Sequence, residues 1–109
     1  MANTFKLKTK ANVGVTTVGI YTAPAATTTV VIGITLANTS GSGVIVGVGI
    51  TRAGTTEDVK LLKNAPIPQG SSLEFMGGNK VVLETTDTLT VDSDTNNSVD
   101  AALTIMEIT

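Results

Sequence analysis

Alternation of apolar residues with small or polar ones is the feature that most constrains the fold of this chain. Two runs show it most clearly, at residues 30–37 and 44–51. Because successive side chains of a β-strand point to opposite faces, each run offers one aliphatic face to a core. Asn38–Gly43 lies between them and is rich in turn-forming residues, so the two runs are predicted to form a long antiparallel hairpin. The residues expected to face the core are Val30, Ile32, Ile34 and Leu36, and Val44, Val46, Val48 and Ile50.

Shorter runs of the same kind fill the rest of the chain. We expect further strands at residues 5–13, 15–21, 59–62, 72–75, 80–83, 89–91 and 99–105. No stretch keeps the spacing of an amphipathic helix, so little or no helix is expected. Short strands separated by turn signals about every 8–12 residues are typical of two packed antiparallel sheets. The sequence therefore predicts an all-β fold, a single antiparallel β-sandwich domain (residues 1–109) of about eight or nine strands, either jelly-roll or Ig-like.

Composition excludes several kinds of chemistry. The 109 residues include no His, Cys or Trp, and only 3% are aromatic. Zinc sites built from His or Cys, disulfides and His-based triads are therefore impossible. We predict no catalytic, cofactor-binding or metal-ligating residue, and no enzyme activity. The net charge of −2 argues against a nucleic-acid partner, and no apolar run approaches the length of a membrane span.

The segment Asp92–Asp100 is the one most like a binding site. Oxygen-bearing side chains at alternate positions resemble the first half of a calcium-binding loop. Asn97 stands where such a loop turns sharply at Gly, and Leu103 where it has a bidentate Glu. We therefore predict a polar hairpin tip whose Asp and Asn side chains cap their own backbone, and leave cation binding open.

Other polar segments have simpler interpretations. Gly77–Lys80 lacks the glycine spacing and the following Ser or Thr of a phosphate loop, so a tight turn is predicted. Glu57–Asp58 and Glu84–Asp87 are pairs of acids, but glycoside hydrolysis needs two carboxylates facing across a substrate platform. Ala23–Thr29 and Ala65–Gly70 contain prolines, which favour sheet edges or connections that cross between sheets.

Charge is unevenly distributed along the chain. Three basic residues alternate near the start, at Lys6, Lys8 and Lys10, and no basic residue follows Lys80. We expect the basic strand and the acidic tail to be solvated strand faces; attraction between them, within a subunit or between copies, is the other interpretation. The acidic tail residues are Glu84, Asp87, Asp92, Asp94, Asp100 and Glu107.

The order of several segments resembles small virion proteins of tailed bacteriophages, including cyanophages. The resemblance runs from about Val15 to the end of the chain and rests on Tyr21–Thr29, Ala37–Ser40, Lys63–Glu74, Gly77–Lys80, Glu84–Asp87 and Met106–Ile108. It implies a non-enzymatic β-sandwich that is made in the host cytoplasm and located in the virion in many copies. It transfers no catalytic residue.

The resemblance leaves two roles open. The first is a capsid decoration or cement protein, bound outside the shell to the major capsid protein or another virion protein, as a homo-oligomer and preferably a trimer. The second is a tail, neck or baseplate component. A carbohydrate-binding or adhesion module is a further alternative, although few aromatic residues are available to stack on sugars. Because small side chains lose little entropy on packing, the face bearing Ile45, Gly47, Gly49 and Thr51 is expected to be an interface.

Overall fold

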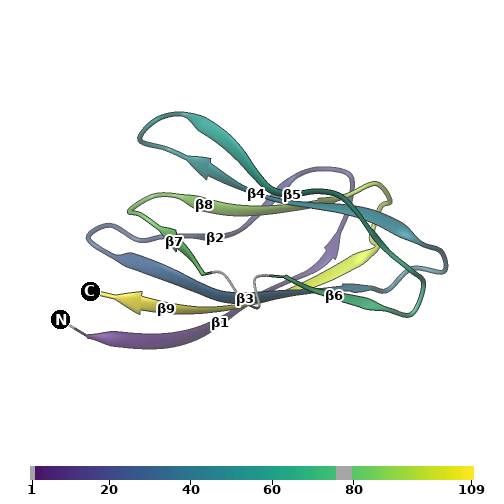
Figure 1. The fold of residues 1–109 in the computed structure, drawn as a ribbon, viewed down its shortest axis with the longest axis horizontal. Coiled ribbons are helices and arrows are strands. Elements are labelled where there is room, and N and C mark those ends of the chain that lie inside the picture. The colour runs from purple at the N-terminus through teal and green to yellow at the C-terminus, as the bar shows by residue number, and fades with distance from the viewer. Residues whose placement is uncertain (1, 76–79) are drawn as a thin grey trace.

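The structure is a computed structural model that describes residues 2–75 and 80–109. Figure 1 shows two layers of strands, and no helix occurs in these two ranges. The predicted all-β sandwich is confirmed. The strands are β1 (Asn3–Val13), β2 (Val18–Thr22), β3 (Thr28–Asn38), β4 (Val44–Arg52), β5 (Glu57–Ile67), β6 (Ser72–Phe75), β7 (Val81–Leu83), β8 (Thr88–Ser93) and β9 (Val99–Ile108).

All the pairings between strands are antiparallel and form two sheets. Sheet A has the order β1-β9-β3-β6, with β7 also paired to β3, and sheet B has the order β2-β8-β4-β5. Strand β3 pairs with β6 through Ile34–Ala37 and with β7 through Thr29–Val31. Strands β6 and β7 therefore follow one side of β3 in succession, as two parts of one interrupted strand. Counted in this way, the eight strands have the order of a jelly roll, in which the chain changes sheet after each strand except between β4 and β5.

The predicted hairpin between residues 30–37 and 44–51 is wrong, although both strands exist. Strand β3 belongs to sheet A and β4 to sheet B, so the connection crosses from one sheet to the other. Asn38 holds this crossing in place: its Nδ2 donates to the carbonyl oxygens of Ser42 at 2.8 Å and Ile67 at 3.0 Å. The aliphatic alternation does not distinguish two strands that are neighbours in one sheet from two strands in facing sheets. Here β3 and β4 lie in facing sheets, and their aliphatic faces meet in the core.

The core-facing residues of β3 also differ from the prediction. Ile34 and Leu36 are buried, whereas Val30 and Ile32 are only half-buried, and Val31 is buried instead. The register of β3 against β9 shifts between Val31 and Gly33. A β-bulge at this point adds one residue to β3, so the alternation changes face there.

The core lies between the two sheets. Strand β4 follows its predicted alternation, with Val44, Val46, Val48 and Ile50 facing inward. Full burial of each such side chain contributes about 1.5–3 kcal/mol. Tyr21 also belongs to the buried cluster. The remaining buried hydrophobic residues are Val13, Ala23, Val31, Ile34, Leu36, Ile67, Leu83, Leu89, Val91, Val99, Ala101, Leu103 and Ile105.

The proline-containing segments lie at a sheet edge or cross between the sheets, as predicted. Residues 23–27 join β2 of sheet B to β3 of sheet A, and residues 68–71 join β5 to β6. Pro66 lies in β5, an edge strand, and edge strands are where sheets tolerate proline. Near the ends of the chain, Ala2 and Thr109 pair through two hydrogen bonds of 3.1 and 3.0 Å, so the first and last strands finish side by side (Figure 1).

Candidate functional site

A buried polar cluster joins the two sheets beside the edge strand β1. Tyr21 of β2 donates its hydroxyl proton to Oε2 of Glu107 in β9 at 2.6 Å. Because that proton is used, the hydroxyl of Thr29 is the donor to the Tyr21 oxygen at 2.8 Å. Lys6 of β1 completes the cluster with its Nζ 2.8 Å from Glu107 Oε1. We call Lys6, Tyr21, Thr29 and Glu107 the tyrosine cluster.

The electrostatics of the tyrosine cluster favour a structural role. Burial, with the hydrogen bond to Glu107, raises the pKa of Tyr21 to about 12. The ammonium of Lys6, with the Tyr21 hydroxyl, lowers the pKa of Glu107. Both pKa values move away from neutrality, so Tyr21 stays protonated and Glu107 stays ionised. Neither group exchanges a proton near neutral pH, as an acid–base catalyst would have to do.

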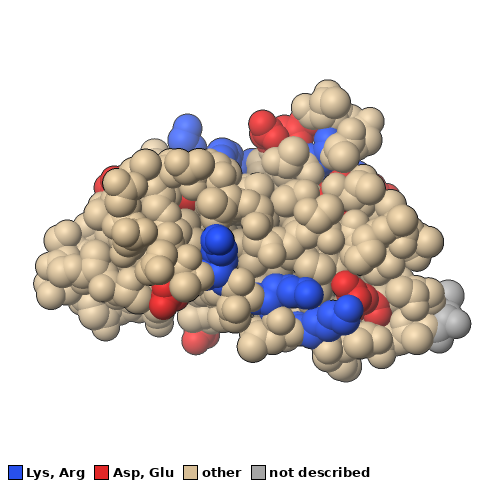
Figure 2. Space-filling view, turned by 180° about the vertical axis from the view of Figure 1, so that it is seen from behind, with Lys and Arg blue, Asp and Glu red and all other residues tan. Residues whose placement is uncertain are grey.

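The lysines of β1 line the edge of the sandwich beside this cluster. Lys6, Lys8 and Lys10 stand opposite Ile105, Leu103 and Ala101 of β9, which face the core. Opposite residues of a strand pair share a face, so the lysine side chains leave β1 on its inner side. The Nζ of Lys8 lies 6.0 Å from the centre of the Tyr21 ring, and Figure 2 shows basic side chains in a row along this edge.

The ion pair between Lys6 and Glu107 corrects one expectation. The basic strand and the acidic tail are not both solvated, because these two residues pair within one subunit and Glu107 is buried. An edge strand presents unpaired backbone groups, and inward-pointing lysines are one way in which proteins prevent such an edge from pairing with another strand. The β1 edge therefore carries a device against uncontrolled strand pairing.

A second polar cluster fixes the turn between β7 and β8. The guanidinium of Arg52, at the end of β4, bonds to both Glu84 and Asp87, with its Nε 3.2 Å from Asp87 Oδ2. These contacts raise the pKa of Arg52, chiefly through its hydrogen bond to Asp87. The buried Asp87 also accepts the backbone N–H of Glu84 at 3.0 Å. The pair of acids predicted at Glu84–Asp87 thus holds a turn around Arg52.

The other pair of acids lies elsewhere. Glu57 accepts a hydrogen bond from the hydroxyl of Thr55 at 3.2 Å, at the start of β5. Neither Glu57 nor Asp58 lines the pocket that Glu84 and Asp87 line. The structure does not bring the two pairs together across one cleft.

The carboxylates of the Asp92–Asp100 segment bond to three separate parts of the chain. Asp92 accepts from the hydroxyl of Thr17 at 3.2 Å, Asp94 from the backbone N–H of Ile45 at 3.1 Å, and Asp100 from the backbone N–H of Asn12 at 3.0 Å. The prediction of a hairpin tip is wrong, because β8 and β9 belong to different sheets and the segment connects them. The three carboxylates also bond to other parts of the chain, and not to the segment's own backbone as predicted. Among the residues that the structure describes, no three His, Cys, Asp or Glu gather closely enough to hold a metal ion.

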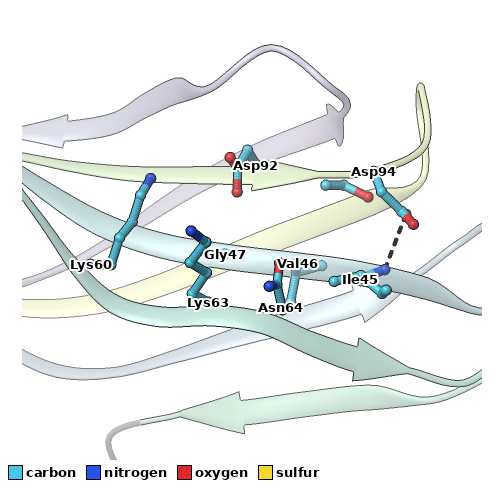
Figure 3. Close-up of a pocket in the computed structure, with 9 residues that line it drawn as sticks. Ile45, Val46, Gly47, Lys60, Lys63, Asn64, Asp92 and Asp94 are labelled. Carbon is cyan, nitrogen blue, oxygen red and sulfur yellow. Dashed lines mark hydrogen bonds between the residues drawn. The ribbon is translucent and has the colours of Figure 1, made fainter.

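A shallow pocket of about 210 Å³ lies over the outer face of sheet B. Figure 3 shows Lys60 and Lys63 entering it from β5 and Asp92 and Asp94 from the other side. Its floor includes Gly47, where a Cβ atom would lie 2.6 Å from Asp92 Oδ1. The face of β4 that was expected to be an interface is therefore partly covered by charged side chains of this chain itself.

The outer face of sheet A is different. Its strand pairs place Phe5 opposite Met106 and Met106 opposite Val30, all on the side away from the core. Phe5 and Leu7 are 69% and 65% exposed, and Val30 and Met106 are half-buried. No individual residue of this face was predicted as a contact residue. Gly77–Lys80, predicted as a turn, lies outside the described residues except for Lys80.

Comparison with known proteins identifies the fold. A subunit of the Bacillus endospore appendages, described as disulfide-linked pili, matches with a TM-score of 0.60 at 15% identity over 99% of this chain and 87% of that one. A chain of the T13 particle of infectious bursal disease virus matches with a TM-score of 0.60 at 12% identity, over 96% of this chain and 30% of that one. A chain of the Gx strain of that virus matches with a TM-score of 0.54 at 14% identity, over 96% of this chain and 36% of that one.

At these identities the likeness concerns the fold alone. This chain spans about a third of the two virus chains and most of the pilus subunit. No protein-family model matches the sequence, and no curated protein matches it. In the part of the chain that the structure describes, no helix has the length and apolar character needed to cross a membrane.

Proposed function

We propose that this protein is a non-enzymatic structural subunit of a tailed-phage virion, present in many copies, and that it decorates the outside of the capsid shell. The observation that carries the proposal is the outer face of sheet A, where Phe5 and Leu7 stand largely in water. Exposed apolar surface of this kind, on a sheet with few charges, is typical of a site that another protein covers. A subunit of a shell or a fibre has such a surface by necessity.

The body behind this face suits repetitive assembly. The tyrosine cluster joins Tyr21 of sheet B to Glu107 of sheet A, and Arg52 ties the end of β4 to the turn after β7. Both links resist sliding of one sheet over the other, so the outer faces keep a fixed orientation. The fold is also shared with a pilus subunit and with chains of an icosahedral virus, which supports a role in assembly.

The positions of Tyr21 and Phe5 argue against the adhesion alternative. Sugar-binding sites commonly stack an exposed aromatic ring on the sugar, yet Tyr21 is only 7% exposed and its hydroxyl bonds to Glu107. Phe5 is exposed, but it lies beside Leu7 and Met106 on the apolar end of the sheet A face. We therefore propose contact with itself and with the major capsid protein or another virion protein, and not with a glycan.

Counting the copies in the particle tests this proposal. Virions of the phage that encodes this chain would be purified, and its copies per particle measured by quantitative mass spectrometry and cryo-electron microscopy. On the order of hundreds of copies on the shell supports decoration, whereas about a dozen places the protein in the tail or neck, because copy number follows the symmetry of the structure occupied. Absence from the purified virion would refute a virion role.

A further inference from the structure

The outer face of sheet A has large apolar side chains at one end and small or acidic side chains at the other. Phe5, Met106 and Val30 form one row across three strands, and Leu7 stands in the next row opposite Thr104. Ile108 extends the apolar region towards the chain ends and is half-buried. In an isolated chain these side chains contact water, so an association that covers them gains free energy.

The charge on this face is confined to its other end. Among the described residues that point outward from sheet A, the charged ones are Glu74 of β6 and Asp100 of β9. Glu74 stands opposite Thr35, and Thr35 stands opposite Ala102. Both acids are thus displaced along the strands from the row of Phe5 and Met106. These outward residues of the described strands include no basic group that could pair with an acidic partner, and within one copy the two acids lie away from the apolar rows.

The size of the face is sufficient for a specific contact. Four strands about 4.8 Å apart, with about nine residues each at about 3.4 Å per residue, cover roughly 600 Å² per subunit. Two such faces in contact would bury about 1,200 Å², which reaches the lower end of the range for stable protein interfaces.

We propose that the outer face of sheet A packs against the same face of a second copy, about a two-fold axis near Leu7 and Thr104, with the strands of the two copies running in opposite directions. This arrangement places the acids of the two copies at opposite ends of the contact, whereas strands running in the same direction would gather all four at one end. Sheets pack face to face about 10 Å apart, so the large side chains of Phe5 and Met106 in one copy would lie over the smaller Thr9 and Ala102 of the other.

This inference deepens the proposed function, because it names the contact through which the subunit associates with itself. It replaces the trimer implied by the resemblance with a two-fold dimer in solution. The tests of the two proposals have separate readouts. The particle count tests the virion role, whereas the state of the purified chain tests the contact, so either can fail while the other holds.

The experiment compares two charge insertions by sedimentation equilibrium over a range of concentrations. Leu7→Glu places a carboxylate near the proposed axis, where it lies close to the same carboxylate of the second copy. The repulsion between them should weaken the dimer by more than about tenfold. Ile45→Glu makes the same change at a 43% exposed residue on the outer face of sheet B and should leave the dimer unchanged. Circular dichroism melts check that both variants fold, and Phe5→Glu provides a second variant of the same face.

Spin labels test the direction of the strands. The chain has no cysteine, so Thr104→Cys and Asp100→Cys can each carry one label on β9. The proposed dimer gives a short distance between Thr104 labels and a clearly longer one between Asp100 labels. Equal distances, a trimer, a monomer at every concentration, or a dimer that survives Leu7→Glu would each overturn the proposal.

Discussion

The outer faces of the two sheets are built on the same scaffold but differ in how completely the chain covers them. On sheet B, Gly47 and Gly49 lie buried beneath side chains from neighbouring strands, including Asp92 and Lys60. On sheet A, the outward side chains near the chain ends are large and apolar, and Phe5 is 69% exposed. Glycine in the middle of a strand leaves room for neighbours to fold over it. One face is thus partly covered within the chain, and the other leaves Phe5 and Leu7 in contact with water.

The largest expected loss of stability comes from a charge on the inner face of β4, compared with the same charge at the neighbouring residue on the outer face. Val46→Asp puts an unpaired carboxylate at a residue that is 2% exposed, whereas Ile45→Asp changes a residue that is 43% exposed. The buried charge should cost about 4 kcal/mol or more, a large part of the total stability of a small domain. We expect Val46→Asp to be unfolded and Ile45→Asp to be folded, as judged by circular dichroism and urea denaturation. A folded Val46→Asp would refute the assignment of the faces.

The next effect concerns the link between the sheets. Tyr21→Phe removes the hydroxyl that donates to Glu107 and leaves the buried carboxylate with Lys6 alone. A hydrogen bond to a charged group contributes about 1.5–3 kcal/mol, and urea denaturation at neutral pH should show a loss of this size. The control is Thr22→Val at the neighbouring residue, which removes an exposed hydroxyl that bonds to Thr88. This change should lower the unfolding free energy by less than Tyr21→Phe does.

The same cluster predicts a pH dependence of stability. The pKa of Glu107 is lowered in the folded state, so its contribution is complete above the ordinary glutamate pKa of about 4.3 and is lost as the pH falls through the lower folded value. The difference in unfolding free energy between the wild type and Glu107→Gln should therefore be greatest at neutral pH and shrink in acid. A difference that stays constant down to pH 2 would contradict this account.

Smaller effects test why sheet B carries glycines. A Cβ atom at residue 49 would lie 2.8 Å from the backbone carbonyl oxygen of Val59, whereas at Gly54 nothing lies within 4 Å. Because the backbone of β5 must shift, Gly49→Ala should cost about 1–3 kcal/mol, and Gly54→Ala should cost almost nothing. Gly47→Ala should fall between them, since the atom in its way is the movable carboxylate of Asp92. Equal thermal stability of all three variants would show that lack of space for a Cβ atom is not why these positions are glycine.

The smallest effect sharpens the contrast between the outer faces. Phe5→Thr and Ile45→Thr both change exposed residues, so each should alter the unfolding free energy of the monomer by less than about 0.5 kcal/mol. If sheet A forms the dimer, melting temperature rises with protein concentration, and only Phe5→Thr should reduce that rise. Equal behaviour of the two variants would remove the distinction between the faces.

Local patterns in the sequence predict the strands better than their partners. The alternation in β4 correctly predicts that Val44–Ile50 has an inner and an outer face. Pro24 and Pro68 correctly mark connections between the sheets. The turn residues after Asn38 do not reveal whether the chain reverses within one sheet or crosses to the other. That choice depends on which other strands pair with β3 and β4, and those lie far away in the sequence. The bulge near Ile32 is likewise invisible in a regular aliphatic run.

The tyrosine cluster was missed, although a signal for it exists. Glu107 continues the inward-facing alternation of Leu103 and Ile105, so an acid stands where a core residue is expected. A carboxylate at such a position requires a buried partner. Tyr21 is 86 residues away, and nothing in the sequence identifies it as that partner before the strand order is known. The outer face of sheet A is hidden for the same reason, because its rows join β1, β9 and β3.

The pairing of Ala2 with Thr109 has a practical consequence. A peptide added before the first strand and a peptide added after the last would both leave the molecule at one corner, beside Phe5 and Ile108. An affinity tag at either end would therefore stand next to the outer face of sheet A and interfere with measurements of association. A few linking residues could instead join the two ends, and new ends opened at Gly41 would carry a tag on the far side of the molecule as a circular permutant.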